Sequence, residues 1–249
     1  MYPILATIIL LLTGNAWQVA LTPPPPPPEE DADIGFVEQL LEYGIYPLAF
    51  YIRLLASALA GCHAATILLL GYAPPDAASQ LLPYICAAEH PSLRLLSAPT
   101  PRFILGIALL GTGALVRLAC VFAAEADSPH TAKDADDGTH GAPDDIPDER
   151  LLTHGPYAYV RHPTHTAVWA MLAGAGVMWT APEAYLRECA VMHTSAGFLV
   201  QAWAVAAVCV AVGLYRRTPS EEAARKEQFG GKWEAYVRRV PYKFVPYVM

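Results

Sequence analysis

The chain has 249 residues, of which 54% are hydrophobic and only 16% are charged. Soluble domains are typically about one quarter charged, so this composition indicates a membrane protein rather than a soluble globular one. The formal net charge is −7, but the acidic and basic residues are segregated along the chain, and no basic patch outside the C-terminal tail suits nucleic acid.

Five apolar stretches approach or exceed the roughly 18 residues that a membrane-spanning helix needs. They cover residues 1–21, 48–73, 103–124, 164–181 and 193–215. The first stretch has no Lys or Arg before its apolar run and no clear small-residue cleavage site, so we expect a retained helix rather than a signal peptide. The predicted fold class is therefore an all-α integral membrane protein with about five transmembrane helices.

Two polar stretches divide the chain into three regions. A Pro-rich connector over 22–43 follows the first span, and its proline run at 23–28 predicts a stiff polyproline II segment. Residues 125–149 are acidic and nearly free of apolar side chains, which predicts a flexible, solvated loop. We expect membrane helices in 1–124 and a second membrane region in 150–249.

The second apolar stretch contains small residues at spacings that allow another helix to approach closely. These residues are Ala56, Ser57, Ala60, Gly61 and Ala64. The five cysteines have no CxxC spacing, and three lie in apolar stretches, which is typical of buried small hydrophobic side chains. The sequence therefore predicts neither a metal site nor a disulfide framework from Cys62, Cys86, Cys120, Cys189 and Cys209.

The last 34 residues form a basic tail with two helix-breaking sites. Thr218, Pro219 and Glu221 have the spacing of a helix start, with Thr218 as the N-cap and Glu221 closing a capping box. Gly230-Gly231 should interrupt this helix, and Pro241 should end a second, short one. The aromatic residues of the tail are typical of a segment that seeks the membrane interface: Trp233, Tyr236, Tyr242 and Tyr247.

The charge of the tail also predicts the topology. It holds 8 of the 16 Lys and Arg residues, namely Arg216, Arg217, Arg225, Lys226, Lys232, Arg238, Arg239 and Lys243. The positive-inside rule places such a segment in the cytosol. Counting back through five spans, residues 125–163 are cytosolic as well and the N-terminus is not, so a folded-back helical tail can meet the residues that precede the fourth span.

A dense polar cluster stands immediately before that fourth span, in LLTHGPYAYVRHPTH at 151–165. It holds Tyr157, Tyr159, Arg161, His162, Pro163 and His165. One interpretation is a binding site built from rings and cationic donors. The alternative is structural: Arg161 and His162 anchor the chain at the membrane interface, and Pro163 starts a helix. In the tail, the structural alternative has Glu222 paired only with Lys226.

Together the two clusters resemble the isoprenylcysteine carboxyl methyltransferase family. The matching blocks are LLTHGPYAYVRHP and, about 60 residues later, a Glu pair at 221–222 followed by FGGKWEAYVRRVP. The resemblance covers about 150–181 and 193–246 and is looser over the first 120 residues. His165 stands where the family has Tyr, Ala167 stands where it has Gly, and the acidic stretch 125–149 replaces a shorter aromatic and basic segment.

The resemblance implies S-adenosylmethionine as the cofactor. The residues that it assigns to the cofactor pocket are Glu149, Arg150, Leu151, Leu152, Tyr157, His162, Pro163, Thr164, His165 and Glu221. It also implies that the acceptor is the C-terminal carboxylate of a prenylated cysteine in CaaX-type proteins. A terminal carboxyl has a pKa near 3.5, so it is already ionised at neutral pH and needs no general base.

Arg217 is the residue that the resemblance assigns to the acceptor, because a guanidinium matches the planar carboxylate. The implied location is the endoplasmic reticulum membrane, multi-pass, with the tail in the cytosol. Prenylated protein C-termini and the lipid bilayer are the expected partners, without metal or nucleic acid. Two alternatives stay open: a methyltransferase acting on a phospholipid amine or another small lipid, and an inactive membrane paralogue.

Overall fold

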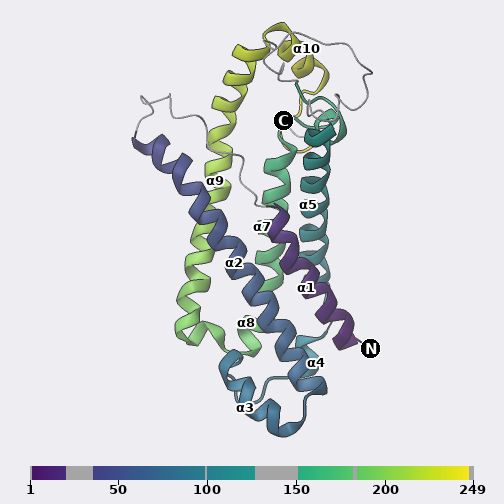
Figure 1. The fold of residues 1–249 in the computed structure, drawn as a ribbon, viewed down its shortest axis with the longest axis vertical. Helices are drawn as coiled ribbons and strands as arrows, with labels where there is room; N and C mark the ends of the chain where they lie inside the picture. Colours follow the sequence, from purple (N-terminus) through teal and green to yellow (C-terminus); the bar gives the residue numbers. More distant parts are fainter. Residues whose placement is uncertain (1, 21–35, 99, 127–150, 182–183, 247–249) are drawn as a thin grey trace, which may run out of the picture. The chain divides into compact units, whose positions relative to one another are not determined.

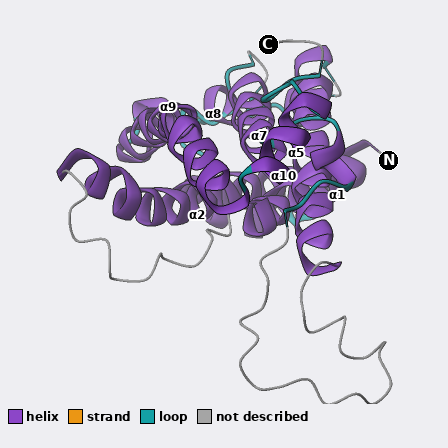
Figure 2. Cartoon of the chain, turned by 90° about the horizontal axis from the view of Figure 1, so that it is seen from above, coloured by secondary structure: helices purple, strands orange, loops and turns teal. Residues whose placement is uncertain are grey.

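A computed structural model describes residues 2–20, 36–98, 100–126, 151–181 and 184–246. In these residues the secondary structure is helical and contains no strand, which confirms the predicted all-α class (Figures 1 and 2). The helices are α1 (Tyr2–Ala20), α2 (Phe36–Tyr72), α3 (Pro75–Ile85), α4 (Leu93–Leu96), α5 (Pro101–Ala126), α7 (Pro163–Trp179), α8 (Tyr185–Glu188), α9 (Ser195–Phe229) and α10 (Gly231–Arg239), with 3-10 turns η1 (Gly155–Ala158) and η2 (Val191–His193). The proline run at 23–28 and nearly all of the acidic stretch lie outside the described residues.

The chain divides into two compact units. The first comprises Met1–Ala114 and Val168–Gly213, and the second comprises Leu115–Ala167 and Leu214–Met249. Helices α5, α7 and α9 each contribute to both units, so the apolar part of α9 belongs to the first and its polar continuation to the second. The two polar clusters found in the sequence both fall within the second unit.

Small residues bring helices of the first unit close together. A Cβ atom at Gly14 of α1 would lie 3.3 Å from the Cβ of Ala60 in α2, and the Ser57 hydroxyl donates to the Gly14 carbonyl at 2.8 Å. This confirms the close helix approach predicted for the second apolar stretch. At the α5–α7 contact, a Cβ at Gly174 would meet the carbonyl oxygen of Gly106 at 2.6 Å, so this contact requires a glycine.

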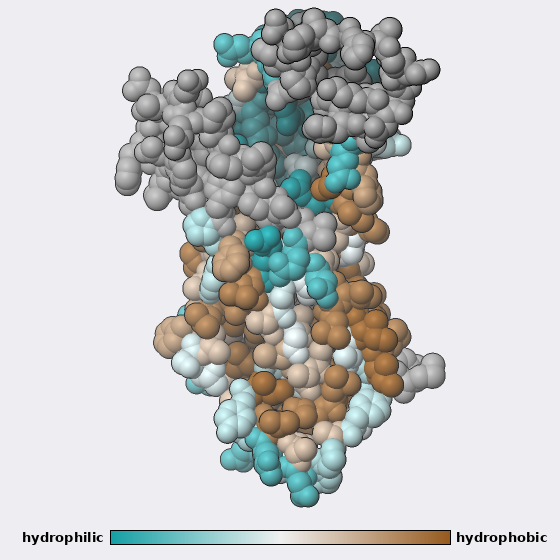
Figure 3. All heavy atoms as spheres, in the orientation of Figure 1, coloured by the Kyte–Doolittle hydropathy of each residue, from teal (hydrophilic) through white to brown (hydrophobic). Residues whose placement is uncertain are grey.

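Three helices, α2, α5 and α9, contain segments long and apolar enough to cross a membrane. Helix α7 has 17 residues, and α1 counts among the shorter apolar helices, so the prediction of five spans is confirmed only in part. Apolar side chains such as Phe198, Val205 and Val208 of α9 are exposed, and Figure 3 shows broad hydrophobic areas on the visible surface. Exposed apolar helix faces suit a lipid environment.

Two helix boundaries differ from the sequence-based prediction. Helix α2 begins at Phe36 and continues through Pro47, so residues 36–43, assigned to the connector, are helical. Helix α9 runs without a break through Pro219, which makes the predicted helix start at Thr218 wrong. The Thr218 hydroxyl instead donates to the Leu214 carbonyl one turn earlier, at 3.0 Å, so it stabilises helix interior rather than capping a new helix.

The predicted break at Gly230 and the short second helix are confirmed. Gly230 has φ +50°, a value that favours glycine, and α10 ends before Pro241. The interface-seeking role predicted for the tail aromatics is wrong for Trp233 and Tyr236. Both rings are buried in a cluster with Val240, and the Arg225 guanidinium lies 5.8 Å from the Trp233 ring centroid. The tail therefore has a small hydrophobic core of its own.

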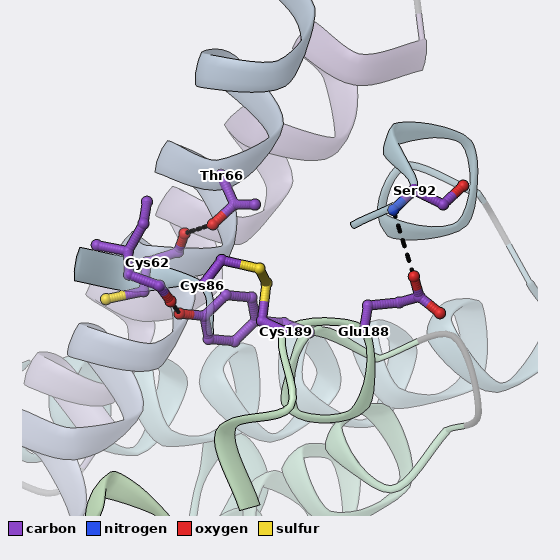
Figure 4. Close-up of a disulfide and its surroundings, with 8 residues drawn as sticks. Cys62, Thr66, Cys86, Ser92, Glu188 and Cys189 are labelled. Carbon is purple, nitrogen blue, oxygen red and sulfur yellow. Dashed lines mark hydrogen bonds between the residues drawn. A yellow bond between two sulfur atoms is a disulfide. The ribbon is translucent and has the colours of Figure 1, made fainter. Parts of the chain in front are cut away.

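A disulfide joins Cys86, which follows α3, to Cys189, which follows α8 (Figure 4). Around it, the Tyr185 hydroxyl donates to the Ile85 carbonyl, and the Ala87 amide donates to the Cys189 carbonyl at 3.1 Å. The sequence analysis predicted no disulfide, because a separation of 103 residues carries no recognisable spacing. In the predicted topology both cysteines lie on the non-cytosolic side, where disulfides persist.

Thiol counting tests this bond. We expect three maleimide-polyethylene glycol adducts per denatured, unreduced chain, on Cys62, Cys120 and Cys209, and five adducts after reduction. A Cys86→Ser/Cys189→Ser double variant should give three adducts under both conditions. Five adducts on the unreduced wild type, analysed by gel mobility of protein taken directly from membranes, would contradict the bond.

Candidate functional site

Three segments of the second unit converge at the start of α7. The amides of Arg161 and His162 donate to the carbonyls of Tyr242 and Lys243 at 3.0 and 2.9 Å. The Thr166 hydroxyl donates to the carbonyl of Phe244 at 2.7 Å. Residues 241–246 are therefore held alongside residues 161–166 by backbone pairing, and the polar part of α9 supplies the third side of the site through Glu221 and Glu222.

Glu221 lies among two imidazoles and a guanidinium. Its Oε2 is 3.4 Å from Nδ1 of His162, and its Oε1 is 3.6 Å from Nε2 of His165 and 3.2 Å from Nε of Arg217. Burial alone would raise the pKa of the Glu221 carboxyl. Hydrogen bonds from His162 and His165 and the positive charge of Arg225 outweigh burial and hold this pKa well below its usual range, so the carboxylate is ionised.

Glu222 holds a second set of cations. Its Oε1 is 2.9 Å from Nη1 of Arg161 and 3.3 Å from Nε2 of His162, and its Oε2 is 3.0 Å from Nζ of Lys243. The structural alternative, in which Glu222 pairs only with Lys226, is wrong: Lys226 pairs with Glu234 at 3.4 Å. Glu222 therefore joins α9, the start of α7 and the C-terminal segment.

The hydrogen-bond partners of the imidazoles decide which nitrogens carry protons. The Thr218 hydroxyl donates its proton to the Leu214 carbonyl. Toward Nδ1 of His165, which is 3.4 Å away, the same hydroxyl therefore acts as an acceptor. A neutral His165 would then carry its proton on Nδ1, and its Nε2, which faces Glu221, would have a lone pair. His162 has a carboxylate at each ring nitrogen, and a neutral ring can donate to only one. A neutral imidazole would thus present a lone pair to the Glu221 carboxylate, and a shared proton, a bound cation or a donor group favours this contact.

Aromatic rings cover the imidazole pair. The rings of His162 and His165 stack with centroids 5.2 Å apart. The Phe244 ring lies 5.9 Å from His162 and 6.4 Å from His165, and 6.2 Å from the ring of Tyr215. A flat, partly apolar surface of this kind can receive an aromatic group beside the charged cluster.

Most of the predicted site residues come together here, and some lie elsewhere. Arg217, Glu221, His162, His165, the fully buried Pro163 and the half-buried Thr164 belong to the site. Leu151 packs against the Trp233 cluster, and Leu152 is half-buried. The Tyr157 carbonyl accepts from the Tyr236 hydroxyl at 2.8 Å, and burial, with nearby Cys120, raises the pKa of Tyr157 to about 12. Glu149 and Arg150 lie outside the described residues.

The cluster also contains residues that were not assigned to a site from the sequence. Glu222, Lys243 and Phe244 complete it. The Arg161 side chain is only 9% exposed, and its Nη2 donates to the Pro241 carbonyl at 3.1 Å, but its Nε has no hydrogen-bond partner. A buried donor without a partner is a candidate ligand contact. The Glu pair and the Arg-His pair were visible in the sequence, but the partner of each was not.

Comparison with known proteins did not extend these observations. No protein-family model, no curated protein sequence and no solved structure matches this chain.

Proposed function

We propose that the protein transfers a methyl group from S-adenosylmethionine to the C-terminal carboxylate of a prenylated cysteine. The observation that carries the proposal is the cluster around Glu221, in which a half-buried carboxylate and two buried imidazoles converge on one point. This set suits an amino-acid ammonium, which offers three donors. The resemblance of the two sequence blocks to the isoprenylcysteine carboxyl methyltransferase family supports the same reading.

The residues present fit the other groups of this cofactor. The unpartnered Nε of Arg161 is a donor for its carboxylate, and the rings of Phe244 and His165 offer a surface for its adenine. When bound, the cofactor supplies an electrophilic methyl group on a sulfonium. The protein then has to orient the acceptor and exclude water, which together account for a large part of such a barrier.

Arg217 is the proposed contact for the acceptor carboxylate. Its side chain is 37% exposed and its Nε contacts Glu221, so the guanidinium would orient the acceptor from beside the donor site. The prenyl chain would reach the site from the bilayer. The three helices that are long and apolar enough to cross a membrane support a bilayer location for the protein. Five spans, a cytosolic tail and an endoplasmic reticulum location belong to this proposal.

Methyl transfer by the purified full chain tests the proposal. We expect transfer of labelled methyl from S-adenosylmethionine to a farnesylcysteine derivative. Glu221→Gln should weaken cofactor binding by roughly 10- to 150-fold, because a charge-assisted hydrogen bond contributes about 1.5–3 kcal/mol. Glu227→Gln, at an exposed position of the same helix, is the matched control and should match the wild type.

The contrary outcomes are distinct. No methylation of the farnesylcysteine derivative by folded protein would overturn the proposal. Methylation of a phospholipid amine in its place would identify the alternative lipid methyltransferase. Equal cofactor affinity in Glu221→Gln and wild type would remove Glu221 from the site.

A further inference from the structure

We infer that His162, His165 and Glu221 form a binding site for a divalent transition metal ion such as Zn²⁺ or Co²⁺. One ligand atom from each residue lies within 4.8 Å of the other two, and both imidazoles are buried. The two histidines occupy the start of α7 and its immediate approach, and Glu221 comes from α9. The inference does not depend on the proposed methyl transfer.

The spacing of the ligand atoms is close to what a zinc ion requires. Bonds of about 2.0–2.1 Å in a tetrahedral site place neighbouring ligand atoms about 3.3 Å apart. The Glu221 oxygens lie 3.4 Å from Nδ1 of His162 and 3.6 Å from Nε2 of His165. All three ligand atoms lie within 4.8 Å of one another, so binding would require the widest pair to close toward about 3.3 Å. Three protein ligands would leave one position open for water.

The second ring nitrogens have the partners that metal-bound histidines usually have. Nε2 of His162 faces the Glu222 carboxylate at 3.3 Å, which is the carboxylate–histidine arrangement that fixes Nδ1 as the metal ligand. Nδ1 of His165 faces the Thr218 hydroxyl at 3.4 Å, which leaves Nε2 directed at Glu221. In each imidazole the nitrogen that faces Glu221 is thus the one available to bind a metal once it carries no proton.

Cations around the cluster compete with a dication for the two carboxylates. The negative charge of Glu222 is matched by Arg161 and Lys243. Arg217 is the cation in contact with Glu221, and its side chain is 37% exposed, so it can move toward solvent when a metal binds. Arg217 is therefore a competitor of the metal, and its removal should strengthen metal binding.

Metal titration of the full chain tests the inference. The protein is purified in detergent with an affinity tag that contains no histidine, stripped with a chelator, and titrated with Zn²⁺ against a competing indicator. We expect one ion per wild-type chain. His165→Gln and Glu221→Gln should each weaken binding by at least about tenfold, since changes to outer partners alone cost 10- to 100-fold, and Arg217→Gln should bind more tightly.

The controls separate this site from adventitious binding. His193→Gln and Glu227→Gln change exposed residues of the same types and should bind like the wild type. Helical circular dichroism and gel-filtration elution check that each variant is folded. Absence of metal uptake by the wild type, or equal affinity in the cluster and control variants, would overturn the inference.

The visible spectrum of Co²⁺ decides the question on the wild type alone. Four- or five-coordinate Co²⁺ bound by nitrogen and oxygen should give intense visible bands, and a weak spectrum like that of aqueous Co²⁺ would overturn the site even if the variants misfold. Metal binding without methyl transfer would refute the proposed function alone, and methyl transfer without metal binding would refute this inference alone. If both occur, the metal should inhibit by competing with the donor.

Discussion

Replacement of Glu222 by Ala is expected to destabilise the second unit by about 3–5 kcal/mol, the usual cost of removing one partner of a buried ion pair. Glu222 is the carboxylate that contacts Arg161, His162 and Lys243. The side chains of Arg161 and His162 are only 9% and 1% exposed, so water replaces the lost partner poorly at these two residues. Alanine is the best helix former, and α9 itself should not be weakened.

Thermal unfolding of the detergent-solubilised chain measures this effect. For a chain of about 250 residues that unfolds as one cooperative unit, the midpoint should fall by roughly 6–20 °C. Glu227→Ala, five residues further along the same helix and exposed, is the matched control and should change the midpoint little. A midpoint for Glu222→Ala equal to that of the control would contradict the bridging role assigned to Glu222.

Removal of the prenyl chain from the acceptor is expected to abolish methylation at any practical concentration. Each buried CH₂ contributes about 0.8 kcal/mol to partitioning into a bilayer, so a farnesyl chain of about 15 carbons dominates acceptor binding. Shortening this chain to about 10 carbons should lower kcat/KM by roughly 10³ if the whole difference is buried, and by roughly 10² if about two thirds of it is buried.

A series of cysteine derivatives with chains of decreasing length checks this expectation in reconstituted vesicles. Cofactor affinity, measured in the presence of each derivative, should stay constant across the series, because the proposed donor site is built from the polar residues around Glu221. Efficient methylation of an unprenylated cysteine derivative would contradict the proposed substrate class, although it would leave the cofactor assignment intact.

The fold was predictable where one physical property dominates. Apolar length identified α2, α5 and α9, and small residues around Ala60 identified a close helix contact. Prediction failed where local and tertiary signals compete. Thr218-Pro219 has the chemistry of a helix start, yet α9 continues through it, because the contacts of Glu221 and Glu222 one turn later require the helix to extend across this position.

The site was predictable as a set of residues and not as a set of pairs. Arg161, His162 and the Glu pair stood out as charged residues beside apolar stretches. The sequence does not encode that His162 lies between two carboxylates or that Phe244 covers the imidazoles, because those contacts depend on where residues 241–246 return. Trp233 and Tyr236 were misread for a related reason: an aromatic tail can pack on itself as readily as on lipid.

The Cys86–Cys189 bond closes a covalent ring that contains everything from the end of α3 to the end of α8, including residues 127–150. A single cut anywhere in that ring would not separate the chain into two pieces, because the sulfur bridge would still connect them. A ring of about 100 residues also restricts the unfolded chain by about 4.7 kcal/mol in the loop-entropy model. A nick in the acidic stretch therefore leaves the two resulting pieces of the chain covalently joined until the disulfide is reduced.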